Sequence, residues 1–270
     1  MEITKIGADI SVLADCQRVP GIGFVPVNAF VLHATEPVVI DTGLSLPGRG
    51  FLTALDSVLD PSDVEWIWIT HPDRDHTGGL RELLDAAPRA RVITTFLGLG
   101  IMSMADPLPM DRVYLLNPGQ SLDVGDRTLT AFRPPLFDNP STTGCYDEHT
   151  GAYFSSDCFG APMPSAELAT CPDVGYVGKN ELRDRQLLWA TVDSPWVHTV
   201  DPAKYLDTLA AVRTFDPAMI LGTHLPPALG RTAEFLDMLA AAPDADRFLG
   251  PDQAALERLL ATFEPATTTD

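Results

Sequence analysis

The spacing of hydrophobic and polar positions along the chain follows two patterns, one typical of strands and one typical of helices. Short apolar runs bounded by Pro and Gly predict strands over 10–15, 28–34, 37–43, 64–70, 90–95 and 218–224. Hairpins are predicted over 119–134 and 144–160. Apolar residues at helical spacing predict helices over 46–60, 78–87 (with Thr77 as its cap), 96–104, 179–192, 203–215 and 231–242. Because strands and helices alternate without a linker or repeat, apart from the polar tail 266–270, we expect one α/β domain spanning 1–270.

Charge and hydropathy exclude two kinds of partner. The chain has 18 Lys and Arg against 37 Asp and Glu, a net charge of −19, which would repel a phosphate backbone, so we expect no nucleic-acid partner. No stretch approaches the roughly twenty apolar residues that cross a bilayer, and no basic region precedes an apolar run at the N-terminus. We therefore expect no membrane association and a cytoplasmic location.

The stretch THPDRDHTGG, residues 70–79, concentrates potential metal ligands at the end of a predicted strand. In an extended loop His71, Asp73 and Asp75 lie on one side, and the following helix turns His76 toward a second point. One loop could therefore serve two neighbouring metal ions. The alternative is a polar turn in which an aspartate caps the helix, but two of only six histidines lie here.

Two later residues have the right position to join this cluster. Asp157 ends the predicted strand AYFSSD, and His224 ends the predicted strand AMILGTH. Strand termini are where α/β folds place their functional sites. Both residues are therefore candidate ligands.

These segments resemble the metallo-β-lactamase superfamily from about Ile10 to about Pro227. The signature H-x-[HED]-x-D-H is met by THPDRDH, and VVIDTG, FSSDCFG and GTHLPP resemble three further segments of the superfamily. The resemblance implies a four-layer αβ/βα sandwich with a dinuclear metal site at the edge of its two sheets. It also implies these roles: His71, Asp73, Asp75, His76 and His224 as ligands, Asp157 as the bridging aspartate, and Asp41 as a residue that supports the metal loop.

Within the superfamily, the chain is most similar to the diiron domain of flavodiiron proteins and to stand-alone oxygen-binding diiron proteins. Asp73 stands where zinc hydrolases generally have histidine, and FSSDCFG also resembles the diiron branch. A carboxylate in place of an imidazole favours iron or manganese over zinc. The resemblance therefore implies two iron ions, with zinc or manganese as alternatives.

One ligand segment departs from the family pattern. The diiron proteins have a histidine in P-x-L-H-x-P-x-S, whereas this chain reads RPPLFDNPS, with Phe137 at the aligned position. Either Asp138 supplies a carboxylate instead, or the first metal site has lost a ligand. Asp138 in DNPS is equally typical of an Asx turn.

Pocket residues are less well defined by the sequence. Trp196 and His198 could project from one face of SPWVHTV and, together with Phe137, line a substrate pocket. Such a histidine is alternatively a hydrogen-bonded structural residue. The segment RVPGIGFVPVNAF, residues 18–30, resembles a flexible early loop that overhangs the site in the superfamily.

Three functions are compatible with these residues, and the sequence does not decide whether the chain is an enzyme. The first is a diiron oxygen-binding or oxidoreductase-type protein; since no flavin-binding loop is present, electrons would come from a separate donor protein or from a small-molecule substrate. The second is a metal-dependent hydrolase that uses a bridging hydroxide on an ester, lactone, thioester or phosphoester. The third is a binding protein with a decayed site. A homo-oligomer is compatible with each.

Overall fold

The computed structural model describes residues 1–44 and 50–261, so the start of the helix expected over 46–60 and the tail 266–270 lie outside the described residues. Among the described residues, one sheet has seven strands in the order of the chain. These strands are β1 (Glu2–Ile6), β2 (Ile10–Val19), β3 (Gly23–Leu32), β4 (Val38–Ile40), β5 (Trp66–Trp68), β6 (Arg91–Thr94) and β7 (Val113–Leu115). Strands β1 to β4 pair antiparallel, and β4 to β7 pair parallel.

The second sheet contains six strands in the described part of the chain, in the order β13-β12-β11-β10-β9-β8. Their bounds are β8 (Ser121–Asp123), β9 (Thr128–Phe132), β10 (Gly144–Asp147), β11 (Ala152–Phe154), β12 (Met219–Leu221) and β13 (Ala228–Leu229). Only β11 and β12 are parallel. This pairing brings the carboxyl ends of β11 and β12 to the same edge.

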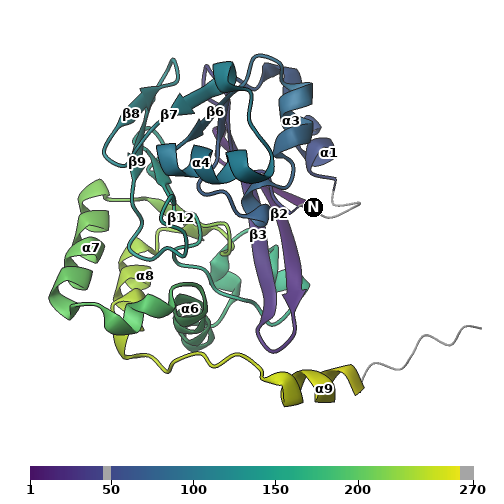
Figure 1. The fold of residues 1–270 in the computed structure, drawn as a ribbon. Coiled ribbons are helices and arrows are strands. Elements are labelled where there is room, and N and C mark those ends of the chain that lie inside the picture. Colours follow the sequence, from purple (N-terminus) through teal and green to yellow (C-terminus); the bar gives the residue numbers. More distant parts are fainter. Residues whose placement is uncertain (45–49, 262–270) are drawn as a thin grey trace, which may run out of the picture.

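Helices cover the outer face of each sheet (Figure 1). The first sheet packs against α1 (Phe51–Asp56), α3 (Leu80–Ala86) and α4 (Phe96–Ala105). The second packs against α6 (Lys179–Asp193), α7 (Pro202–Phe215) and α8 (Thr232–Leu239). The remaining helices are α2 (Arg74–Thr77), α5 (Ala166–Ala169), α9 (Gln253–Ala261) and the 3-10 turns Pro61–Asp63, Met110–Arg112, Val174–Tyr176, Pro195–Thr199 and Ala242–Asp244.

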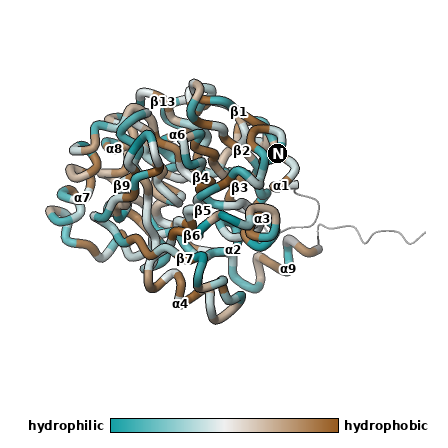
Figure 2. The backbone as a smooth tube through the Cα atoms, turned by 90° about the horizontal axis from the view of Figure 1, so that it is seen from above, coloured by the Kyte–Doolittle hydropathy of each residue, from teal (hydrophilic) through white to brown (hydrophobic). Residues whose placement is uncertain are grey.

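A third apolar cluster lies between the inner faces of the two sheets. Alternate residues of β2, such as Ile10 and Val12, meet Leu129 of β9 and Phe154 of β11 there. Burying both faces of each sheet produces the four layers that the resemblance implied. Figure 2 shows the same arrangement from above, with β3 to β6 in the middle and α3 and α7 at opposite sides.

The structure corrects two local expectations. The expected loop over 18–30 is instead a hairpin, because β2 continues to Val19 and β3 begins at Gly23. Thr77 does not cap the next helix: it is the last residue of α2, and its hydroxyl donates a hydrogen bond to the carbonyl oxygen of Asp73 (2.9 Å). No helix among the described residues is long and apolar enough to span a lipid bilayer.

Candidate metal centre

All of the candidate ligands lie at one edge of the two sheets, on segments that follow strands, with Asp75 and His76 in the short helix α2. His71 to His76 follow β5, Asp138 follows β9, Asp157 follows β11 and His224 follows β12. The packing of the two sheets therefore brings together side chains that are far apart in the sequence. His71 and His224, for example, are 153 positions apart. The candidate ligands thus lie at strand termini, where α/β folds place their functional sites, and their role as a metal site stays a prediction.

A first group of donors surrounds the ring of His71. Its Nε2 lies 3.4 Å from Asp157 Oδ2 and 3.8 Å from both Asp73 Oδ2 and Asp138 Oδ1. His71 is buried, whereas the side chains of Asp73 and Asp138 are 47% and 30% exposed, so this group opens toward solvent. One imidazole and three carboxylates could hold one cation here.

A second group surrounds the other oxygen of Asp157. Asp157 Oδ1 lies 3.0 Å from His76 Nε2 and 3.2 Å from His224 Nε2. The carboxylate of Asp75 completes this group, at 3.8 Å from His76 Nε2 and 3.3 Å from His224 Nε2. Two imidazoles and two carboxylates could hold a second cation, and Asp157 faces both groups with different oxygens.

Two buried atoms in this cluster test whether cations fit. His76 Nε2 and Asp157 Oδ1 are fully enclosed, yet neither makes a hydrogen bond of good geometry, although they lie 3.0 Å apart. Buried polar atoms without hydrogen bonds are costly and rare in native proteins. A cation shared by both atoms would satisfy them, so the residues of the second group fit a bound cation.

Asp41 holds the ring of His76 from the side opposite to the cluster. Its Oδ2 accepts hydrogen bonds from His76 Nδ1 and from the Thr70 hydroxyl, both at 2.8 Å, while its Oδ1 accepts from the Thr70 backbone N–H (2.8 Å). Asp41 itself has a positive φ of 55°, a conformation that aspartate and asparagine tolerate better than most residues. It therefore directs His76 Nε2 toward the cluster.

The other two histidines are oriented in the same way. His224 Nδ1 lies 2.7 Å from the carbonyl oxygen of Pro26, to which it donates a hydrogen bond. His71 Nδ1 lies 3.1 Å from Ser156 Oγ, which donates onward to the Thr70 hydroxyl (2.9 Å). With each Nδ1 engaged, each Nε2 is free to act as a ligand, which is the arrangement of outer contacts typical of metal-binding histidines.

The charges of the cluster are strongly interdependent. Burial disfavours an imidazolium at His76, but Asp41 and Asp157 outweigh burial and raise its pKa well above 6.5. For His224, burial is likewise outweighed by Asp157 and Asp75, and its pKa is raised. Burial also opposes ionisation of Asp157, yet the surrounding histidines lower its pKa well below 3.8. The protein thus favours net positive charge at this point, which protons or metal cations can supply.

The structure shows which of Phe137 and Asp138 faces the donor cluster. Asp138 joins the first group, and the Asx-type turn is made by Asn139, whose Oδ1 accepts a hydrogen bond from Ser141 N (3.0 Å). Phe137 packs instead on Trp196, with ring centroids 5.1 Å apart and the Trp196 indole N–H donating to the Phe137 carbonyl (2.8 Å). The aspartate, and not the aromatic residue, therefore faces the cluster.

His198, the third predicted pocket residue, has a backbone carbonyl as its contact. Its Nδ1 lies 3.2 Å from the carbonyl oxygen of Pro243, in the 3-10 turn after α8. The structure thus favours the structural alternative for this histidine. Trp196, by contrast, packs next to the Asp138 segment as described above.

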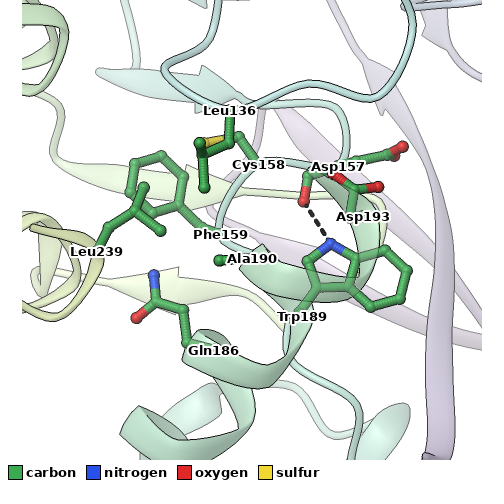
Figure 3. Close-up of a pocket in the computed structure, with 9 residues that line it drawn as sticks. All are labelled: Leu136, Asp157, Cys158, Phe159, Gln186, Trp189, Ala190, Asp193 and Leu239. Carbon is green, nitrogen blue, oxygen red and sulfur yellow. Dashed lines mark hydrogen bonds between the residues drawn. The ribbon is translucent and has the colours of Figure 1, made fainter. Parts of the chain in front are cut away.

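Sequence reasoning missed two residues of α6. The Trp189 indole N–H donates a hydrogen bond to the Asp157 carbonyl (3.0 Å; Figure 3). The centroid of its ring lies 4.6 Å from that of His224. Asp193 lies beside Asp157 in the same view. One carboxylate oxygen from each of Asp138, Asp157 and Asp193 lies within 4.8 Å of the others, close enough for the three to hold one cation. Burial, followed by these two carboxylates, raises the pKa of Asp193 well above 3.8. No local motif marks either residue, because α6 reaches the site only through packing on the second sheet.

Comparison with known proteins identifies the class first. Residues 22–141 match the family model of the metallo-beta-lactamase superfamily, the family that the sequence resemblance predicted. Its neighbours in sequence and in structure include flavodiiron proteins.

Three of these neighbours illustrate the range. The anaerobic nitric oxide reductase flavorubredoxin of Salmonella typhi is 28% identical over 177 residues, which are 65% of this chain and 36% of the relative. The flavodiiron protein of Giardia intestinalis superposes with a TM-score of 0.77 at 14% identity, covering 90% of this chain and 59% of the other. Rubredoxin oxygen:oxidoreductase of Desulfovibrio gigas gives 0.72 at 19% identity, covering 89% and 61%. The chain spans less than half the length of the curated relatives that it matches.

Proposed function

We propose that the protein binds two metal ions, most favourably iron, and acts as a dinuclear oxygen-binding or oxidoreductase-type protein. The observation that carries this proposal is the position of Asp157, whose two carboxylate oxygens face two separate groups of imidazole and carboxylate donors. Two similar proteins support the proposal by their names, the anaerobic nitric oxide reductase flavorubredoxin and rubredoxin oxygen:oxidoreductase.

The donor set supports iron over zinc. The first group offers His71 with three carboxylates, and the second offers His76 and His224 with two. Cys158 adjoins Asp157 but is buried in the apolar cluster below it, so no thiolate competes as a soft ligand. Imidazole and carboxylate donors suit iron and manganese, whereas catalytic zinc sites of this kind rely more on histidine.

The chain's own residues would position and insulate this centre. When bound, an iron pair would supply the redox chemistry by which dioxygen or a related small oxidant is reduced. Asp41 keeps the Nδ1 proton on His76, and the Pro26 carbonyl keeps the Nδ1 proton on His224. Electrons would come from a separate donor protein or from an organic substrate.

The test is elemental analysis by mass spectrometry of protein purified from unsupplemented medium, together with its visible absorption in air. Two irons per chain, with absorption that disappears after dialysis against a chelator, are the expected result. Two zinc ions would replace the proposal with the metal-dependent hydrolase. One metal per chain would mean that the first group, with Asp138 in place of histidine, does not hold a metal.

A further inference from the structure

A cavity of about 350 Å³ opens directly beside the second group of donors. Asp75 and His224 contribute to its lining, so a molecule in the cavity would lie against the proposed metal position. Sites for small organic molecules have volumes of about 300–1,000 Å³. The cavity is therefore far larger than a diatomic oxidant requires.

Most of the cavity wall is aliphatic and comes from the β2–β3 hairpin. Val25 pairs with Gln17 and Val27 pairs with Asp15, so these valines and Val19 project from the same face of the hairpin. Ile22, in the turn between the strands, and Leu44 extend the apolar wall. A wholly polar ligand would lose its own hydration in this cavity without finding polar partners on the apolar wall.

Trp189 forms the opposite, rigid part of the wall. Its indole is held by the hydrogen bond to the Asp157 carbonyl and lies against the ring of His224. Gly160 leaves room for it, since a Cβ there would come within 2.3 Å of Trp189 Nε1. An aromatic surface fixed at this place suits a flat or extended apolar group.

Among the described residues that line the cavity, Arg74 is the one with a cationic side chain. Arg74 is exposed, and no ion pair or hydrogen bond of its guanidinium is found among residues 1–44 and 50–261. Other arginines of this acidic chain, such as Arg81 and Arg127, are paired with aspartates. An unpaired guanidinium beside an apolar wall matches a ligand that carries one anionic group.

We infer that this cavity binds an organic acid with an apolar body, oriented with its body against the hairpin and Trp189 and its anionic group toward Arg74. The inference rests on the proposed function only in that such a molecule would be the substrate of the metal pair. Binding itself depends on the cavity, so it can be measured with and without metals.

The test is isothermal titration calorimetry of the full chain with octanoate and, as a neutral probe of equal length, octan-1-ol. We expect saturable binding of octanoate, both to metal-loaded and to chelator-treated protein. R74Q should weaken octanoate binding about threefold to tenfold and leave octan-1-ol unchanged, because it removes only the ionic contact. I22S should weaken both probes, because it removes apolar contact area.

Matched controls come from the same element and from a distant one. R18Q removes an exposed arginine from the opposite face of β2, and L206S removes an exposed apolar side chain from α7; neither should change binding. Equal octanoate affinity in R74Q and wild type, or binding that disappears whenever the metals are removed, would overturn the inference. Metal content measured on each sample separates the two proposals: intact octanoate binding in a protein that never takes up metal would refute only the proposed function.

Discussion

Asp157 contributes one oxygen to each of the two donor groups, which makes it the residue whose loss should affect both metals. We predict that Asp157→Ala abolishes binding of both ions, whereas Asp138→Ala, which touches only the first group, lowers the stoichiometry from two toward one. Metal content by mass spectrometry and the fold by circular dichroism check both variants. Asp123→Ala, an exposed aspartate of β8, is the control. Full occupancy of one ion in Asp157→Ala would contradict a bridging role.

Asp41 acts through His76 and not by direct contact with a cation. We predict that Asp41→Asn weakens metal binding about 10- to 100-fold, the usual cost of losing an outer carboxylate partner of a ligand histidine. Asparagine tolerates the positive φ of 55° at this position, so the fold should persist. Competition with a chromogenic chelator measures the affinity. An unchanged affinity would show that His76 needs no partner at Nδ1.

Protons should compete with metal in this site. The pKa values of His76 and His224 are raised above 6.5, and burial together with Asp157 raises that of Asp138 above 3.8. A group with a raised pKa still holds its proton at a pH where it otherwise would not, so metal must displace that proton. We therefore predict that metal affinity increases with pH between about 6 and 8, up to tenfold per unit for each proton released. Calorimetry in buffers of different ionisation enthalpy counts these protons, and a pH-independent affinity would contradict the prediction.

At the residue level, the sequence predicted the donors that lie in short motifs but not those that arrive by packing. His71 to His76, Asp157 and His224 each follow an apolar run that reads as a strand. Asp138 was left open because Phe137 and Asp138 differ by one position, and backbone direction decides which side chain faces the cluster. Asp193 has no such signal, since its place depends on how α6 lies on the second sheet.

At the level of elements, the β2–β3 hairpin shows where pattern reading fails. The Gly- and Pro-rich residues 18–30 resembled a flexible loop of the superfamily, yet β3 pairs there with β2 and also meets Met163, through hydrogen bonds of 2.8 Å (Phe24 N to Met163 O) and 2.7 Å (Met163 N to Phe24 O). These long-range bonds cannot be read from local composition. They also anchor the wall of the cavity to the rest of the fold.

The approach of the hairpin to Met163 requires glycine at position 23. Gly23 has a φ of +130°, and a Cβ there would lie 2.7 Å from the Met163 carbonyl oxygen. We predict that Gly23→Ala lowers the free energy of unfolding by roughly 1–3 kcal/mol. Gly100→Ala in α4, where a Cβ meets nothing within 4 Å, should be neutral or stabilising. Urea unfolding midpoints compare the two, and equal midpoints would mean that the hairpin contact carries no strain.

On the scale of the whole molecule, the order and spacing of the motifs carried the resemblance to the superfamily, and that resemblance implied the layered fold that the structure shows. Short edge strands such as β1 and β13 were not predicted, since they are completed by pairing with β2 and β12 and not by their own composition. That residues 1–270 form one domain stays a prediction, as do the cytoplasmic location and the electron donor.

The two sheets contribute different ligands, so bound metals should link them. His71 to His76 belong to the half built on the first sheet, and Asp138, Asp157 and His224 to the half built on the second. Metal that binds only the folded chain stabilises it by about 2.7 kcal/mol per site at a free concentration 100 times the dissociation constant. For a chain of this size, that corresponds to roughly 5–10 °C in Tm per site.

We therefore predict that chelation lowers Tm by roughly 5–10 °C for each metal removed. Unfolding should remain a single transition, because both halves lose the same link at once. Differential scanning calorimetry with and without chelator measures this, and Asp157→Ala, which cannot join the two groups, serves as the variant without a metal-dependent shift. If chelation left Tm unchanged in the wild-type protein, or if Asp157→Ala kept the full shift, the metals would not connect the two sheets. If chelation shifted only a separate transition at lower temperature, the metals would stabilise only the half built on one of the two sheets.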